Sequence, residues 1–148
     1  MEPEDFRVRP IGVIHTQFRR LSQCPRQGAP AGVEGKVVLD DKMLPALKDL
    51  ETCTHLILFS WFHQADRTKM EAKPPDGDKV RGVFATRSPN RPNPIGFHVV
   101  QLLSIEGNLL HVKGLDCLDG TPLLDIKPYF GSLDAFPEAV VGWREEAR

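Results

Sequence analysis

The sequence predicts a mainly β protein: a small single-domain β-barrel with one short helix and long loops. Most segments between turn residues are short, apolar and rich in β-branched or aromatic residues, which is typical of strands. The turn residues recur at close spacing, and a sheet of many such strands loses its exposed edges when it closes. A chain of 148 residues with 41% hydrophobic content can build one core. We therefore expect one domain over residues 1–148, with a core at about 7–130 and a tail at 131–148.

Seven segments have the strand pattern: residues 7–16, 33–39, 55–63, 80–86, 95–105, 109–115 and 123–126. Residues 55–63 are almost continuously apolar, which predicts a central strand buried on both faces. The segments 95–105 and 109–115 are joined by Glu106-Gly107-Asn108, and this short connection predicts an antiparallel hairpin.

One segment has helical spacing. In residues 42–50, Met43, Leu44, Leu47 and Leu50 recur on one face, and Pro45 lies in the first turn. Residues 64–78 are polar, contain Pro74-Pro75 and mix both charge signs. They predict a long exposed loop, either one that closes over a site or a connection without a role.

The charge distribution argues against a strong non-specific nucleic-acid binder, because the net charge is only −1. Two stretches, residues 6–33 and 79–105, nevertheless contain several basic residues and no acid. They are either solvated strand edges or the lining of a site for an anionic group.

Several other classes of protein are disfavoured. Three widely spaced cysteines make no disulfide framework, the five histidines have no zinc-ligand spacing, and no apolar run reaches membrane-helix length. We therefore expect a cytoplasmic protein without a metal or a membrane segment. Neither a dinucleotide-binding glycine motif nor a phosphate-binding P-loop is present, and Ser88 lacks the surroundings of a hydrolase nucleophile.

The segment 87–96 is the strongest candidate for a ligand site. Its three prolines, Pro89, Pro92 and Pro94, fix backbone angles and so lower the entropy cost of ordering a loop around a ligand. Its polar side chains offer forked donors for a carboxylate or phosphate and amide groups that donate and accept. These side chains are Arg87, Asn90, Arg91 and Asn93. The alternative is a rigid barrel corner.

Three weaker candidates lie elsewhere. Pro25-Arg26-Gln27-Gly28 is a turn whose importance depends on its neighbours in the fold. In residues 115–122, an Asp-Gly turn explains Asp119, whereas Asp116 at a strand end can accept from ribose hydroxyls. His63 and Gln64 end the central strand where the long loop begins.

The stretch Gly82-Val-Phe-Ala-Thr-Arg-Ser-Pro-Asn-Arg-Pro-Asn-Pro-Ile-Gly96 strongly resembles the defining motif of the TsaA-like (TrmO) family of tRNA methyltransferases. Three further stretches match that family in order: Pro25-Arg26-Gln27, Phe62-His63-Gln64, and residues 115–129. The resemblance implies a β-barrel homodimer that transfers a methyl group from S-adenosylmethionine. The family's described target is the exocyclic adenine nitrogen of threonylcarbamoyl-adenosine beside the tRNA anticodon.

By motif position, the resemblance assigns cofactor contacts to Pro25, Arg26, Gln27, His63, Gln64, Arg87, Phe97, Leu115, Asp116, Cys117 and Leu118. Arg91, Asn90 and Asn93 would contact RNA or support the loop. The target nitrogen carries a proton, so Asp119 and His63 are candidate catalytic bases.

Longer members continue past the Lys-Pro-Tyr stretch into a C-terminal region thought to help hold tRNA, whereas this chain stops at Arg148. We therefore expect either that a minimal barrel dimer binds tRNA or that the substrate differs. Two alternatives stay open: a non-catalytic barrel that binds adenosine or RNA, and a small-molecule methyltransferase of the same fold.

Overall fold

The computed structural model describes residues 6–146, which fall into two compact units. The barrel unit comprises residues 6–61 and 96–129, and the loop unit comprises residues 62–95 and 130–146. Each unit is described by itself. Within the described residues, no helix is long and apolar enough to span a membrane.

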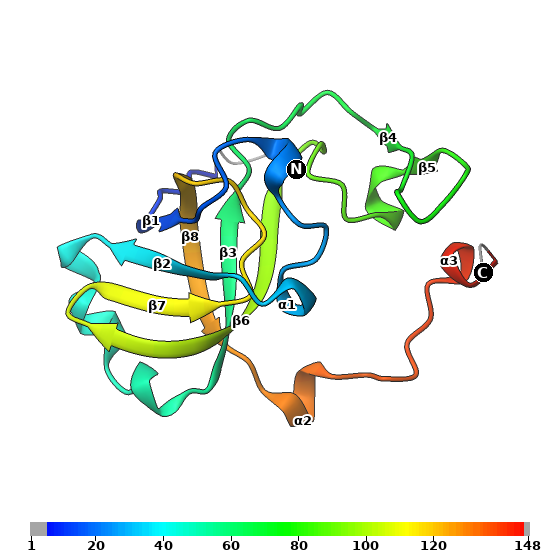
Figure 1. Ribbon diagram of the computed structural model, residues 1–148. Helices are drawn as coiled ribbons and strands as arrows, with labels where there is room; N and C mark the ends of the chain where they lie inside the picture. Colours follow the sequence, from blue (N-terminus) through cyan, green and yellow to red (C-terminus); the bar gives the residue numbers. More distant parts are fainter. Residues whose placement is uncertain (1–5, 147–148) are drawn as a thin grey trace. The chain divides into compact units, whose positions relative to one another are not determined.

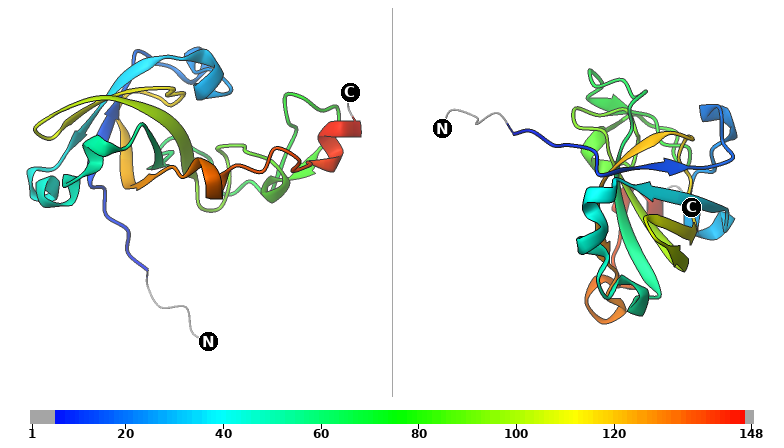
Figure 2. Two further views of the ribbon diagram at one scale, coloured as in Figure 1. Left: turned by 90° about the horizontal axis from the view of Figure 1, so that it is seen from below. Right: turned by 90° about the vertical axis from the view of Figure 1, so that its left-hand side faces the viewer.

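Six strands form a closed barrel, which confirms the expected fold class. They pair in the order β1-β2-β7-β6-β3-β8, and β8 pairs with β1 to close the ring. Figure 1 shows β2, β7 and β6 side by side, and Figure 2 shows the β1–β2 connection extending beyond the ends of those strands. The strands are β1 (Gly12–His15), β2 (Glu34–Leu39), β3 (His55–Trp61), β6 (Ile95–Glu106), β7 (Leu109–Lys113) and β8 (Thr121–Pro128).

The core lies inside this ring, because alternate residues of each strand point inward. Ile14 on β1 is paired with Val37 on β2, which in turn is paired with Leu110 on β7, and none of the three is exposed. Leu56 and Leu58 of β3 fill the same interior. Each buried side chain of this size stabilises the fold by about 1.5–3 kcal/mol.

The prediction that the 55–63 strand is buried on both faces is wrong. The strand ends at Trp61, and Leu56, Leu58 and Ser60 are buried while the residues between them are half-exposed. A closed barrel has a single interior, so alternate side chains of any strand must face outward. On that outer side Phe59 packs edge-to-face against Phe97, with ring centroids 5.9 Å apart.

The hairpin predicted at residues 106–108 is confirmed. Strands β6 and β7 are antiparallel, with Glu106 opposite Leu109. Gly107 has φ of 61°, a left-handed conformation that glycine adopts without a steric penalty.

Two of the sequence predictions differ from the structure in their details. The helix expected at residues 42–50 is a 3₁₀ segment, η2 (Asp41–Leu47), with Pro45 inside it and Asp40 capping the N–H of Lys42. Only four residues of the 7–16 segment are strand.

The other helical segments were not predicted, because each is too short to show helical periodicity in the sequence. They are η1 (Leu21–Gln23), α1 (Gly28–Ala31), η3 (Leu50–Thr52), η4 (Val83–Ala85), α2 (Gly131–Asp134) and α3 (Gly142–Glu146).

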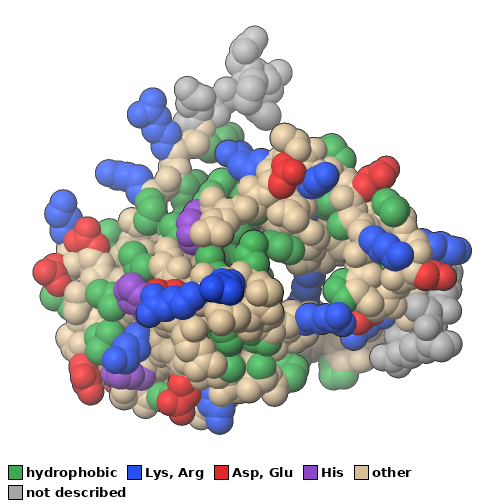
Figure 3. All heavy atoms as spheres, turned by 45° about the horizontal axis from the view of Figure 1, so that its top comes forward, with side chains coloured by type: hydrophobic (Ala, Val, Ile, Leu, Met, Phe, Trp, Pro, Cys, Tyr) green, Lys and Arg blue, Asp and Glu red, His purple; other side chains and the backbone are tan. Residues whose placement is uncertain are grey.

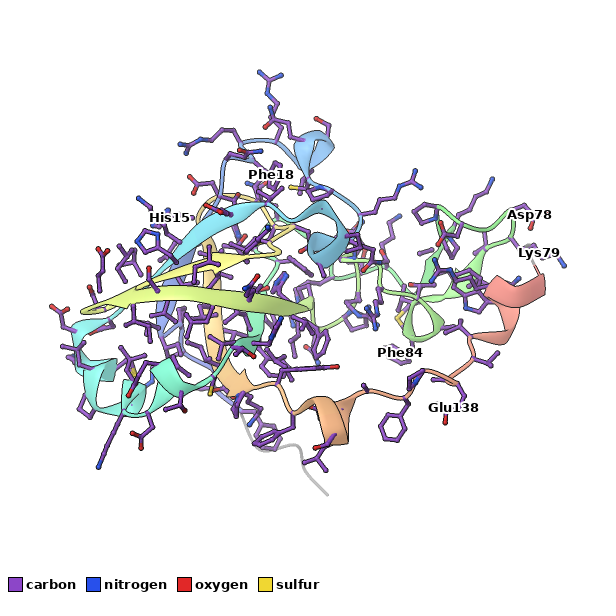
Figure 4. The ribbon with its side chains drawn as sticks, turned by 60° about the horizontal axis from the view of Figure 1, so that its bottom comes forward. His15, Phe18, Asp78, Lys79, Phe84 and Glu138 are labelled. Carbon is purple, nitrogen blue, oxygen red and sulfur yellow. The ribbon has the colours of Figure 1, made fainter. Side chains whose placement is uncertain are left out.

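The prediction of a strand at residues 80–86 is also wrong. This segment contains the two-residue strand β5 (Arg81–Gly82), which pairs with β4 (Glu71–Ala72), and then continues into η4. Asp78 and Lys79 lie at the outer end of the β4–β5 connection (Figure 4). The carbonyl of Val83, the first residue of η4, accepts from the N–H of Thr86 and from the guanidinium of Arg91, rather than from a neighbouring strand.

The C-terminal segment of the loop unit packs on the β4–β5 region. The indole Nε1 of Trp143, on α3, donates to the carbonyl of Ala85 at 2.8 Å. The guanidinium of Arg81 lies 5.6 Å from the centre of the same ring. Arg144 pairs with Asp76 at 3.3 Å. Residues 142–144 therefore help to hold the β4–β5 region of this unit together.

Candidate functional site

The proline-rich segment of the loop unit is organised around Arg91. Its guanidinium donates to the carbonyls of Val83, Thr86 and Ser88 at 3.1–3.2 Å. A guanidinium carries its five N–H donors on three nitrogens in one rigid plane, whereas the three donors of an ammonium share a single nitrogen on a flexible stem. The sequence left two roles open for Arg91, contact with RNA or support of the loop. These hydrogen bonds favour support of the loop.

The two asparagines of the segment also contact the protein. Asn90 Oδ1 accepts from the backbone N–H of Asp66 at 2.9 Å, and Asn93 Oδ1 accepts from Arg67 at 3.3 Å. Arg67 Nε also donates to the carbonyl of Pro92 at 2.8 Å. The beginning of the long loop is therefore fixed to the proline-rich segment by hydrogen bonds.

Three residues with predicted cofactor contacts lie in the same unit with exposed side chains: His63, Gln64 and Arg87. The chain that carries His63 and Gln64 is anchored just before them, because the N–H of Phe62 donates to the carbonyl of Pro94 at 2.8 Å. The unit thus brings residues 62–67 beside residues 90–94.

In the barrel unit, the fold places the turn at residues 25–28 against residues 114–116. The backbone N–H of Gly28 donates to Asp116 Oδ2 at 3.1 Å. A Cβ added at Gly28 would lie 2.0 Å from the carbonyl oxygen of Gly114, so only glycine fits there. Two candidate stretches are thus in contact through a bond from the backbone N–H of one to a side-chain carboxylate of the other, 88 residues away in the sequence.

The other oxygen of Asp116 contacts a buried histidine. Asp116 Oδ1 is 2.9 Å from His98 Nδ1, and His98 Nε2 is 2.7 Å from the hydroxyl of Ser60. The side chain of His98 is 1% exposed and that of Asp116 is 23% exposed. The carboxylate therefore joins the barrel interior to the turn at residues 25–28.

Asp119 lies in a separate cluster at the end of β1. Its carboxylate accepts from His15 Nδ1 and from the N–H of Thr16, each at 3.1 Å, and pairs with Arg19. Partial desolvation raises the pKa of Asp119, but these hydrogen bonds and the charges of Arg19 and His15 outweigh it, so the net shift is downward. His15 points away from the barrel (Figure 4). A lowered pKa keeps Asp119 ionised and makes it a weaker base.

Apart from the carboxylate of Asp116, the segment 115–118 offers backbone groups rather than side chains. Leu115, Cys117 and Leu118 are buried, and burial raises the pKa of the Cys117 thiol to about 12. Cys117 is therefore not a thiolate nucleophile at neutral pH. The carbonyl of Cys117 accepts one bond, from Thr16 Oγ1, whereas that of Leu118 accepts two, from the N–H and the hydroxyl of Thr121. Because a carbonyl oxygen has two lone pairs, the Cys117 carbonyl can accept a second bond.

The remaining predicted contacts of this unit are on its surface. Pro25 is half-buried and Arg26 and Gln27 are exposed, while Phe97 is 50% exposed beside Phe59. Basic and acidic side chains are interspersed on the face in Figure 3, without one continuous basic stripe. Among residues 6–146, no group of three or more His, Cys, Asp or Glu side chains could hold a metal ion.

The sequence analysis included Gly28 in the candidate turn but gave it no role of its own, and it did not distinguish His98 from the other four histidines. The signal for His98 was its position two residues from Gly96 and Val100, which share the buried face of β6. A histidine on the inward face of a strand needs polar partners, and Ser60 and Asp116 provide them.

Residues 13–135 match the family model described as the tRNA-methyltransferase O N-terminal domain. A relative from Archaeoglobus fulgidus, called a probable S-adenosyl-L-methionine-binding protein, is 47% identical over 95% of this chain. One from Methanothermobacter thermautotrophicus with the same description is 40% identical over 91% of this chain and 98% of its own length. The Escherichia coli tRNA (adenine(37)-N6)-methyltransferase is 33% identical over 96% of this chain and 65% of its own length.

The crystal structure of TrmO from Pseudomonas aeruginosa is similar to this chain, with a TM-score of 0.79 and 39% identity. The match covers 94% of this chain and 62% of that one. This chain spans 38% of the Archaeoglobus relative. The similarity therefore covers nearly all of this chain and only part of several longer relatives.

Proposed function

The chain belongs to the family of the tRNA-methyltransferase O N-terminal domain, and from that premise we propose that it is an S-adenosylmethionine-dependent tRNA methyltransferase. Its substrate is the exocyclic nitrogen of the adenine beside the anticodon, carried as threonylcarbamoyl-adenosine. The printed activity of the Escherichia coli relative supports the adenine target. The names of the archaeal relatives support the cofactor.

The observation that carries this proposal is the contact of residues 25–28 with residues 114–116 in the barrel unit. Both stretches are candidates for cofactor binding, and a ligand at their junction would meet exposed side chains and backbone carbonyls. Arg26 supplies a forked donor for a carboxylate, and the carbonyl of Cys117 retains capacity for an amine or hydroxyl donor. These groups fit the zwitterionic methionine end and the adenosine of the cofactor.

The residues proposed to contact the cofactor in the barrel unit are Pro25, Arg26, Gln27, Phe97, Leu115, Asp116, Cys117 and Leu118. In the loop unit, the proposed cofactor contacts are His63, Gln64 and Arg87, and each is to be tested singly. Arg87 is the second candidate, after Arg26, for binding the carboxylate of the cofactor's methionine end. Asn90, Arg91 and Asn93 support the loop that carries Arg87.

The cofactor supplies an electrophilic methyl group on a sulfonium, and the protein's main task is to hold donor and nucleophile in line, at about 3–3.5 Å. Rigid turns suit that task because little motion remains to be lost on binding. The adenine nitrogen must lose a proton. Asp119 is a weak acceptor because of its lowered pKa, so His63, whose imidazole is the common general base of enzymes, is the preferred candidate.

A homodimer and tRNA are the proposed partners, as the family resemblance implies. A methyltransferase acting on a small molecule is the second candidate, because the net charge of −1 and the interspersed surface charges give tRNA no dominant basic surface.

The proposal is tested with labelled S-adenosylmethionine and bulk tRNA prepared with and without threonylcarbamoyl-adenosine. Label in the modified tRNA alone supports it. Cofactor binding without label in any RNA contradicts the tRNA substrate and favours the small-molecule candidate. Absence of cofactor binding contradicts the proposed function altogether.

A further inference from the structure

His98 and Ser60 form a hydrogen-bonded chain inside the barrel that the proposed chemistry does not use. It runs from the Ser60 hydroxyl through the imidazole of His98 to Asp116 Oδ1, with distances of 2.7 and 2.9 Å. The order serine, histidine, carboxylate is that of a nucleophilic triad. Ser60 is 0% exposed, however, so no substrate can reach its oxygen. The chain therefore has a different role.

The direction of the hydrogen bonds follows from the groups. A carboxylate oxygen only accepts, so Nδ1 of His98 is the donor to Asp116. In the tautomer that carries its proton on Nδ1, Nε2 accepts from the hydroxyl of Ser60. The ring of His98 and the hydroxyl of Ser60 lie inside the barrel, where an unpaired polar group is costly. The ring is therefore held on both sides, and it holds one oxygen of Asp116 in place.

The second oxygen of Asp116 accepts from the N–H of Gly28, which directly follows the turn residues Pro25, Arg26 and Gln27. The orientation that His98 imposes on the carboxylate thus sets where the turn can lie. A carboxylate turned away from its place beside His98 would lose its bond to the N–H of Gly28, and the turn would then be held at this point only by packing of Gly28 on Gly114.

We propose that His98 is a positioning residue that places the 25–28 turn against residues 114–118 through Asp116, and so sets the affinity for S-adenosylmethionine. The identity of the ligand, S-adenosylmethionine, rests on the proposed function. The placement itself can be measured without any ligand.

The test compares His98→Gln with His98→Asn, with His111→Gln on β7 as a matched control. The amide nitrogen of asparagine is bonded to Cγ, as Nδ1 is in histidine, so His98→Asn keeps a donor for Asp116. The amide of glutamine is one bond further out and reaches toward Ser60 instead. A merely structural role for a buried ring would make both substitutions similarly damaging.

The first measurement is hydrogen exchange of the Gly28 amide in the ligand-free protein. Exchange is expected to be at least about tenfold faster in His98→Gln than in wild type and His98→Asn. The free energy of one ordinary hydrogen bond corresponds to about a tenfold change in the equilibrium constant for opening of the bonded amide. The second is the Kd for S-adenosylmethionine by calorimetry. We expect it to rise about tenfold in His98→Gln and to stay within about threefold in His98→Asn and His111→Gln.

An unchanged Gly28 exchange rate in folded His98→Gln overturns the positioning role, whether or not the protein binds the cofactor. Equal losses of affinity in the two His98 variants overturn it as well. If His98→Gln does not fold, His98→Asn decides: slow Gly28 exchange with near-wild-type affinity supports the proposal, and loss of either overturns it. A wild-type protein that binds no S-adenosylmethionine contradicts the proposed function and leaves the exchange comparison valid.

Discussion

The N–H of Gly28 and the carboxylate of Asp116 are hydrogen-bonded at 3.1 Å, and the other oxygen of that carboxylate contacts a histidine inside the barrel. This relationship ties a surface turn to the core across 88 residues of sequence. It means that the position of Arg26 and Gln27 depends on packing inside the barrel. Five experiments test the contacts and the function proposed above. Four compare substituted proteins with wild type, and one identifies the reaction product.

Gly28→Ala is expected to destabilise the protein by about 1–3 kcal/mol and to weaken cofactor binding, because the new Cβ would lie 2.0 Å from the carbonyl oxygen of Gly114. Urea unfolding and calorimetry measure the two effects. Gly131→Ala is the control, because a Cβ there meets nothing within 4 Å. A variant as stable as wild type would show that residues 25–28 are not confined by residues 114–116.

Arg91→Lys is expected to lower the free energy of unfolding by about 1–3 kcal/mol, because a single ammonium nitrogen cannot take the places of the two guanidinium nitrogens that donate to three carbonyls. Urea unfolding measures this loss, and limited proteolysis within residues 62–95 is expected to become faster. Arg9→Lys, at an exposed position, is the control. Unchanged proteolysis would mean that the prolines alone fix the loop.

Asp119→Asn tests the ion cluster at the end of β1 through pH. Because the folded pKa of Asp119 lies below its ordinary value of 3.8, its carboxylate stabilises the protein above that value, and this contribution is lost as pH falls through the folded pKa. Urea midpoints are therefore expected to differ between wild type and variant at about pH 5–7 and to converge as the pH falls from 3.8 through the lower folded pKa of Asp119. Asp78→Asn, on the β4–β5 connection, is the control. A difference that grows as the pH falls would contradict the assigned sign.

Arg26→Ala and Arg87→Ala test the carboxylate contact of the cofactor. Loss of a charge-assisted hydrogen bond costs about 1.5–3 kcal/mol, so the variant that lacks the true partner should bind S-adenosylmethionine at least about tenfold more weakly. Calorimetry gives the Kd, and Arg20→Ala is the control from the same basic stretch. Unchanged affinity in both variants would exclude both assignments.

Much of the fold could be predicted because its signals are local. Strands β2, β3, β6 and β7 follow from runs of β-branched and aromatic residues, and the hairpin follows from the short connection at Gly107. The strand expected at residues 80–86 was wrong because the chain turns at η4, where the Val83 carbonyl accepts from the N–H of Thr86 and from the side chain of Arg91. The bond from Arg91 leaves no periodic pattern in the sequence. The 42–50 helix was expected as a regular helix, but it is a 3₁₀ segment with Pro45 inside it.

The candidate site was only partly predictable from physical chemistry. Stiffness and polar groups identified the proline-rich segment, and the family resemblance linked it with the three other stretches. The contact between Gly28 and Gly114 and the chain from Ser60 to Asp116 depend on how distant strands meet in the barrel. Such contacts leave no periodic signal in the sequence.

The most direct test of the proposed function is the identity of the product nucleoside. Modified tRNA is incubated with the protein and S-adenosylmethionine, digested to nucleosides and analysed by mass spectrometry. The proposed function predicts that threonylcarbamoyl-adenosine is converted to a form heavier by one CH₂ group, with the added methyl on its exocyclic adenine nitrogen. Unaltered nucleosides, from a protein shown to bind the cofactor, would contradict it.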